Sequence, residues 1–130
     1  TRAQLIARRQ PFIAETVFSH PAKLDLVRAA QAADFMVALH VLLVPEQLSV
    51  ERVRRRVAAG GHDVPEEKIR QRYRRLWRNV ATAIALADTS VVYDNAHIDG
   101  PREIARYASG QPVGAANWPR WAPSELRELP

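Results

Sequence analysis

Apolar residues occur along the chain in short continuous runs, separated by stretches in which they recur with a helical period. Three continuous runs predict β-strands, at residues 12–16, 35–44 and 89–94. The run 35–44 is nearly uninterrupted, which is typical of a parallel strand buried on both faces of its sheet. Between the first two runs, residues 23–33 predict a helix with inward positions Leu24, Val27 and Ala30.

The helical period is clearest between the second and third runs, where it predicts two helices joined by a tight turn. The first helix carries an apolar stripe of valines at positions 50, 53 and 57, and Gly60-Gly61 ends it, because glycine accepts the left-handed conformation of a helix C-terminus. The second helix is predicted over residues 65–86, with a proline and two glutamates in its first turn. Its inner positions are Ile69, Tyr73, Leu76, Val80 and Ile84. We call residues 46–86 the arginine hairpin.

The order strand, helix, strand, helix pair, strand predicts an α/β fold with a parallel sheet, flanking helices and right-handed crossovers. A helix end is predicted before Pro11, within residues 1–10. The Gly/Pro-rich residues 96–130 form a C-terminal extension. In it we expect a strand at 102–109, a hairpin partner at 113–117 and a helical turn at 124–129. With 130 residues, the chain is one domain or part of one.

Positive charge is concentrated in one part of the chain. Residues 50–79 hold nine of the seventeen arginines and carry a net charge of +6, whereas the whole chain carries +5. The positive field is therefore local, which favours an anionic partner bound at one place. A planar guanidinium suits phosphate because it donates two parallel hydrogen bonds.

The composition excludes several classes of protein. The chain has no cysteine, so it has neither a disulfide framework nor thiolate chemistry. Its longest apolar run, 35–45, is too short to span a bilayer, and no signal peptide is visible, which predicts a cytoplasmic protein. His20 and His97 have no partner at metal-ligand spacing, so we predict no zinc site. His40, inside an apolar strand, is interpreted as a core histidine.

Polar residues follow each predicted strand at its carboxyl end, where open α/β sheets bind ligands. These residues are Glu15-Thr16, Pro45-Glu46 and Asp94-Asn95. Asp94-Asn95 is as consistent with a turn as with a site. Two tryptophans of the tail, Trp118 and Trp121, either stack on a base or pack the Pro-rich tail, and we favour packing.

A resemblance to a known family rests on three stretches. The signature Gly60-Gly61-His62-Asp63-Val64-Pro65, with its flanking arginines, resembles the lid of zeta-toxin-like P-loop ATPases and kinases. The run Phe12 to Thr16 is similar to the family strand that ends in Glu-Thr. Ala87-Asp88 followed by Tyr93-Asp94-Asn95 is similar to the last core strand of that family.

The resemblance implies an adenylate-kinase-like, P-loop-kinase-like fold that transfers the γ-phosphate of ATP or GTP, with Mg²⁺, to a small acceptor. In zeta toxins proper the acceptor is a UDP-linked amino sugar, and an antitoxin protein blocks the site. Lid arginines of the family contact phosphates, which implies catalytic roles for Arg56, Arg70 and Arg72 and nucleotide binding by Arg52, Arg56 and Arg70. Glu15 and Thr16 would then bind the acceptor substrate.

The sequence departs from the family pattern in one element. A P-loop needs G-x-x-x-x-G-K-[ST], and none of the five glycines directly precedes a lysine. We therefore expect either that the domain is incomplete at its N-terminus, with the P-loop upstream of Thr1, or that the protein is a degenerate relative.

Two other functions stay open. One alternative is a non-catalytic binding module whose basic helix pair binds nucleic acid or an acidic protein, and the other is a pseudo-enzyme. Nucleic acid is disfavoured, because Glu51, Asp63, Glu66 and Glu67 interrupt the basic helices.

Overall fold

A four-stranded sheet forms the centre of the protein. The structure is a computed structural model that describes residues 1–129. The sheet order is β1-β2-β3-β4, with β1 at Ala38–Leu43, β2 at Thr89–Asp94, β3 at Arg102–Ala108 and β4 at Gln111–Pro112. β1 and β2 are parallel, whereas β2–β3 and β3–β4 are antiparallel. The fold is therefore a mixed α/β fold, as the alternation of strands and helices predicts, with parallel pairing at β1 and β2.

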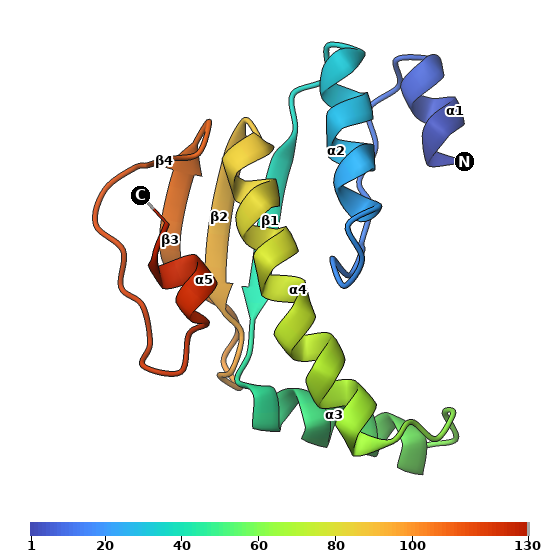
Figure 1. The fold of residues 1–130 in the computed structure, drawn as a ribbon, viewed down its shortest axis with the longest axis vertical. Helices are drawn as coiled ribbons and strands as arrows, with labels where there is room; N and C mark the ends of the chain where they lie inside the picture. The colour runs from blue at the N-terminus through green and yellow to red at the C-terminus, as the bar shows by residue number, and fades with distance from the viewer. Residues whose placement is uncertain (130) are drawn as a thin grey trace.

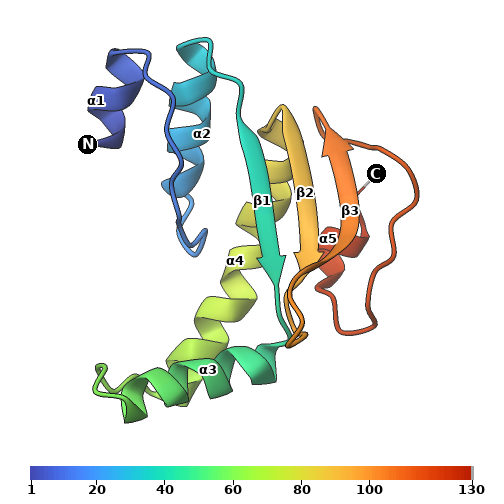
Figure 2. The same cartoon turned by 180° about the vertical axis from the view of Figure 1, so that it is seen from behind.

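Two of the five helices cover one face of this sheet. The helices are α1 (Arg2–Ala7), α2 (Lys23–Ala32), α3 (Glu46–Ala58), α4 (Glu66–Leu86) and α5 (Ser124–Arg127), and α1 and α2 lie beside the β1 edge of the sheet. Figure 1 shows α4 and α5 across the sheet, and Figure 2 shows the strands from behind with no helix in front of them. α3 and the first half of α4 extend beyond the carboxyl ends of β1 and β2.

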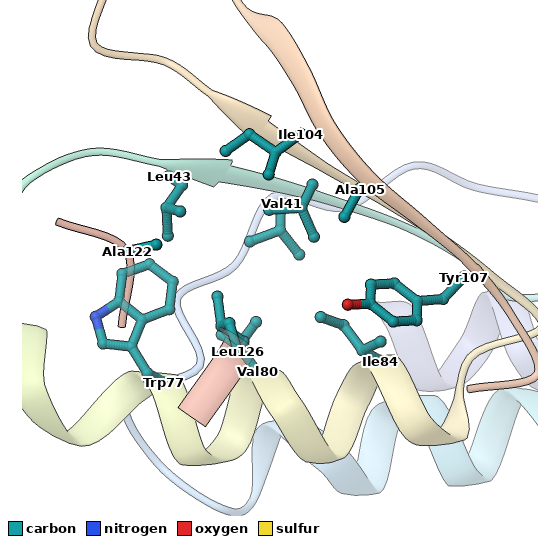
Figure 3. Packing of buried hydrophobic residues seen from close by; sticks show 11 residues of the cluster. Val41, Leu43, Trp77, Val80, Ile84, Ile104, Ala105, Tyr107, Ala122 and Leu126 are labelled. Carbon is teal, nitrogen blue, oxygen red and sulfur yellow. The ribbon is translucent and has the colours of Figure 1, made fainter. Parts of the chain in front are cut away.

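The core lies between the sheet and α4 with α5 (Figure 3). Leu43 of β1, Val92 of β2 and Leu126 of α5 are completely buried, and Ile84 of α4 is 1% exposed. Burying one such side chain contributes about 1.5–3 kcal/mol. Because Leu126 belongs to this cluster, the C-terminal extension packs into the same core as the sheet.

Asp88 aligns the two parallel strands. Its Oδ2 accepts the Val37 N–H at 2.7 Å, and its own N–H donates to the Val37 carbonyl at 3.0 Å. In this register Leu43 is paired with Asp94, so β1 and β2 end at the same level. The residues that follow both strands are thereby brought to one edge.

The expected strand at residues 12–16 is wrong, because these residues have no strand assignment and make no backbone–backbone hydrogen bond within residues 1–129. The Glu15 carbonyl accepts instead from the Arg2 guanidinium at 2.8 Å. Phe12 packs edge-on against Phe35, and Ile13 is fully exposed. The stretch is thus held by Arg2 of α1 and by the contact with Phe35, and its backbone does not join the sheet.

Two further expectations about strands need correction. The strand predicted at 35–44 is Ala38–Leu43 and is buried on one face, since Leu42 is 56% exposed on the face that no helix covers. His40 lies on that open face too, with its Nδ1 3.1 Å from the Tyr93 hydroxyl, and is not a core histidine. The predicted partner strand 113–117 is replaced by the short β4, because Gly114 adopts a positive φ of 76° just after it.

Candidate functional site at the carboxyl edge of the sheet

The arginine hairpin is attached directly to the end of β1. α3 begins one residue after Pro45, and the Tyr73 hydroxyl of α4 donates to the Val44 carbonyl at 2.6 Å. Burial, helped by the nearby Glu46 carboxylate, raises the pKa of Tyr73 to about 12. The phenol is thus held in its neutral, donating form, and it fixes α4 against the start of α3.

Glu46 joins the two helices of the hairpin at their base. Its carboxylate accepts from Arg70 Nη1 at 2.9 Å and from Arg74 Nε at 2.9 Å. The hydrogen bond from Arg74, together with the one from Arg70, lowers the pKa of the Glu46 carboxyl. Arg70 also donates to Gln47 Oε1 at 2.8 Å, so its guanidinium is engaged within the hairpin.

The tip of the hairpin is shaped by the two glycines that the sequence marks. The Gly61 N–H donates to the Arg56 carbonyl and the Gly60 N–H to the Val57 carbonyl, both at 3.0 Å, which is the Schellman pattern. Gly60 has a φ of 105°, and a Cβ on Gly61 would lie 3.0 Å from the Arg56 carbonyl oxygen. Arg54 and Glu66 form an ion pair across the helices beside this turn.

Arg52 connects the hairpin to the loop after β2. Its Nη2 donates to the Asn95 carbonyl at 3.0 Å. Arg56 lies one helical turn further along α3, on the same face as Arg52. This places Arg56 on the face that turns toward the carboxyl edge of the sheet.

Asn79 anchors the opposite side of the hairpin. Its amide donates to the Phe18 carbonyl at 2.7 Å, so α4 holds the segment that follows Glu15 and Thr16. Arg72 and Arg75 lie at i−7 and i−4 from Asn79 and share its face. Glu15 is exposed and Thr16 is partly buried in this segment, outside the sheet.

The arginines of the hairpin divide into two groups. Arg54, Arg70 and Arg74 form ion pairs with glutamates, and Arg52 binds a backbone carbonyl. A second group makes no ion pair or side-chain hydrogen bond with residues 1–129. Its members are Arg55, Arg56, Arg72, Arg75 and Arg78, all exposed. These five guanidiniums are available to an anion without breaking an internal contact.

A second polar cluster lies at the end of β2, where the sequence indicated Asp94-Asn95 but not the contribution of His97. His97 Nε2 is 3.0 Å from Asp94 Oδ2, and Asp94 Oδ1 accepts the Ala96 N–H at 2.9 Å. Asp94-Asn95 is therefore part of a turn, and the same carboxylate orients an imidazole. In the sequence, the spacing of Asp94 and His97 at i and i+3 directly after a strand end could have indicated this pair.

This His–Asp pair lines a cleft of about 180 Å³ between β2, β3 and the loop that precedes α5. Across the cleft lie Asn117 and Trp118 from the C-terminal extension. Trp118 and Trp121 both pack against the core cluster, as favoured from the sequence.

Within the described residues, no three or more His, Asp or Glu side chains gather closely enough to hold a metal ion. None of the helices in that part of the chain is long and apolar enough to cross a bilayer.

The fold is a mixed α/β sheet whose two parallel strands end beside a basic helical hairpin, at the edge where open α/β sheets bind their ligands. The family model described as zeta toxin matches residues 1–100, and the chain belongs to the zeta toxin family. Membership implies a kinase-type toxin that binds a nucleotide, and it suggests an antitoxin partner. Searches of curated proteins and of solved structures found no match. Residues 101–129, which include Asn117 and Trp118, lie outside the matched region.

Proposed function

We propose that the complete protein is an ATP- or GTP-dependent kinase of a small-molecule acceptor, and that the arginine hairpin is its lid. The observation that carries this proposal is the group of unpaired arginines on a hairpin rooted at the carboxyl ends of β1 and β2. Five exposed guanidiniums without internal partners suit the several negative charges of a triphosphate. Membership of the zeta toxin family supports phosphoryl transfer as the reaction.

Arg56 and Arg72 are the residues best suited to the transferred phosphoryl group. Arg56 shares a face of α3 with Arg52, which binds the Asn95 carbonyl at the sheet edge. Arg72 shares a face of α4 with Asn79, which binds the Phe18 carbonyl of the acceptor-side segment. In phosphoryl transfer, charge spreads over the equatorial oxygens of the transition state, and guanidiniums that reach this charge accelerate the reaction about 10³-fold or more. Closing the lid also excludes water from the phosphates.

Arg70 has a different role in this proposal. Its guanidinium is bound to Glu46, so it contacts a phosphate only by exchanging one anionic partner for another. Glu15 and Thr16, which lie next to the segment held by Asn79, bind the acceptor in this proposal. Mg²⁺ neutralises phosphate charge in such reactions, and within residues 1–129 no three His, Asp or Glu side chains gather closely enough to hold a metal ion.

The test is nucleotide turnover in the complete protein with Arg56→Ala and Arg72→Ala. We expect each variant to lose at least tenfold in kcat, because a contact made in the transition state is removed. Arg8→Ala is the control for the loss of one positive charge, since Arg8 is exposed and lies outside the arginine hairpin. Turnover within about twofold of wild type in both variants would remove the assigned role.

A further inference from the structure

We infer that Glu46 is a positioning residue for the phosphates that the arginine hairpin binds. It holds Arg70 and Arg74 on one flank of the hairpin. In doing so, it keeps Arg56 and Arg72 together on the opposite flank. This inference rests on the proposed function, because it names what holds in place the arginines that this function needs.

One flank of the hairpin is joined by ion pairs between its two helices. Arg54 of α3 pairs with Glu66 of α4 near the tip. Near the root, the Glu46 carboxylate accepts from Arg70 and from Arg74 at 2.9 Å each. Those two arginines are one helical turn apart on α4, so a single carboxylate bridges two successive turns. The charges of this flank are therefore compensated within the hairpin.

The opposite flank carries cations that make no ion pair with residues 1–129. With about 3.6 residues per turn, the valine stripe of α3 separates Arg54 from Arg56. The apolar stripe of α4 separates Arg70 from Arg72 in the same way. Because the two stripes face each other, Arg56 and Arg72 come to one flank. Arg52 reaches the loop after β2 from this flank, so it is the one that faces the sheet edge.

Apolar packing alone does not fix how the two helices are turned and shifted against each other. α3 packs chiefly against α4, beyond the carboxyl ends of the strands (Figure 2). Val50 of its stripe is completely buried, whereas Val53 and Val57 are partly exposed. Contacts between such side chains are non-directional, whereas hydrogen bonds to a carboxylate are directional. The Glu46 and Arg70 side chains are only 25% and 23% exposed, so solvent screens this pair less than an exposed one.

Loss of the Glu46 bridge has two effects on anion binding, and they have opposite signs. It removes a negative charge and frees Arg70 and Arg74, which favours an anion. It also lets the helices shift, which disfavours a phosphate that must touch Arg56 and Arg72 at once, since a misplacement of about 1 Å can cost about 100-fold in rate. A purely electrostatic role of Glu46 thus predicts tighter binding when the charge is removed, whereas positioning predicts weaker binding.

The test is calorimetric titration of the intact protein with inorganic tripolyphosphate, which carries neither base nor sugar. We expect Glu46→Gln to bind it roughly tenfold more weakly than the wild type, the scale of one lost hydrogen bond to a charged group. Glu51→Gln is the matched control, because it removes the same charge from the same helix. Glu51 is exposed and accepts only a 3.4 Å hydrogen bond from Gln47, so this variant should bind as tightly as the wild type or slightly more tightly.

A double-mutant cycle separates positioning from a general loss of structure. In the variant with both Arg56→Ala and Arg72→Ala, the arginines to be positioned are gone. Adding Glu46→Gln to it should change the affinity no more than adding Glu51→Gln does. A loss of folded protein would instead lower the affinity by the same factor in both backgrounds.

Three outcomes would overturn the inference. They are absence of tripolyphosphate binding by the wild type, binding by Glu46→Gln at least as tight as by Glu51→Gln, and an undiminished effect of Glu46→Gln when both arginines are removed.

Nucleotide turnover tests the kinase proposal separately. If Arg56→Ala and Arg72→Ala keep wild-type turnover, the kinase proposal fails, while the tripolyphosphate cycle still decides whether Glu46 positions these arginines. If turnover does depend on them, Glu46→Gln should lower kcat/KM about tenfold or more, because contacts with the transition state need the same arrangement. An unchanged kcat/KM in that case would contradict the positioning role.

Discussion

The guanidinium of Arg52 on α3 donates a hydrogen bond to the backbone carbonyl of Asn95, 3.0 Å away in the loop after β2. Those two residues are 43 positions apart, and their contact ties the first helix of the arginine hairpin to the edge of the sheet. The same loop carries His97 and Asp94. This hydrogen bond therefore joins the arginine hairpin to the loop that lines the cleft.

Replacing Arg52 should loosen α3 without unfolding the core. We expect Arg52→Gln to lower the local stability of α3 by about 1 kcal/mol, the scale of one hydrogen bond from a partly exposed charged group. Hydrogen exchange should become faster for amides of residues 46–58 and stay unchanged in the buried half of α4. Arg55→Gln is the control, because Arg55 is exposed and unpaired on the same helix. Equal protection in both variants would contradict the tether.

Glu46 should make the stability of the protein fall in acid. Its hydrogen bonds with Arg74 and Arg70 lower the pKa of its carboxyl below the ordinary 4.5. A carboxyl whose pKa is lower in the folded state stabilises the protein above about pH 4.5, and that contribution is lost as the pH falls through the folded-state pKa. Carboxyl groups in proteins titrate within about one unit of pH 4, so the free energy of unfolding should be measured with urea between about pH 3 and 6. Over this range it should fall less in Glu46→Gln than in the wild type.

Glu51→Gln provides the comparison for Glu46. Glu51 lies on the same helix, is exposed, and accepts only a long 3.4 Å hydrogen bond from Gln47. We expect its acid profile to match that of the wild-type protein. A Glu46→Gln profile that also overlays the wild type would show that the arginine contacts do not contribute to stability.

Tyr73 should control stability in alkali. Its pKa is raised to about 12 by burial and by Glu46, so its contribution is complete below the unfolded-state value of 10 and is lost as the pH rises toward 12. Tyr73→Phe removes the hydrogen bond to the Val44 carbonyl and should cost about 1 kcal/mol at neutral pH. Above pH 10 its stability should decline less steeply than that of the wild type. Tyrosinate absorbance during an alkaline titration should lose its highest-pH component in this variant.

Truncating Leu126 should destabilise the whole domain. This side chain of α5 is completely buried among residues of α4 and the sheet. Leu126→Ala should lower the free energy of unfolding by about 2–5 kcal/mol, measured by urea denaturation. Leu129→Ala is the graded control, since Leu129 is only partly buried against the same cluster and should cost less. A small effect of Leu126→Ala would mean that the extension is not part of the core.

Elements with a strong local signal were predictable from the sequence. The third predicted strand, 89–94, coincides with β2, and both hairpin helices and the Gly60 turn form as predicted. The stretch 12–16 has the composition of a strand, but a strand also needs a partner for its backbone, and here the Glu15 carbonyl is bound by Arg2. Local pattern specifies a helix more completely than it specifies a sheet pairing.

The candidate site was predictable in location but not in detail. Polar residues after strand ends indicated the edge of the sheet at which the hairpin and the cleft lie, and arginine placement indicated the hairpin. Which arginines are free depends on Glu46, which pairs with Arg70 and Arg74 across 24 and 28 positions of sequence. The cleft opposite His97 depends on Trp118, which comes from a loop with no helical or strand period. Such long-range pairings follow from the folded topology.

The parallel crossover from β1 to β2 has a consequence for the order in which the chain folds. The whole arginine hairpin lies inside this crossover, whereas β2 and β3 are separated by a short loop. Contacts between distant residues form late, because the intervening chain must first be closed into a loop. We therefore expect β2, β3 and the second half of α4 to assemble first, with β1 joining only after the hairpin has closed. The helix pair at the ligand edge would then set the rate at which the sheet is completed.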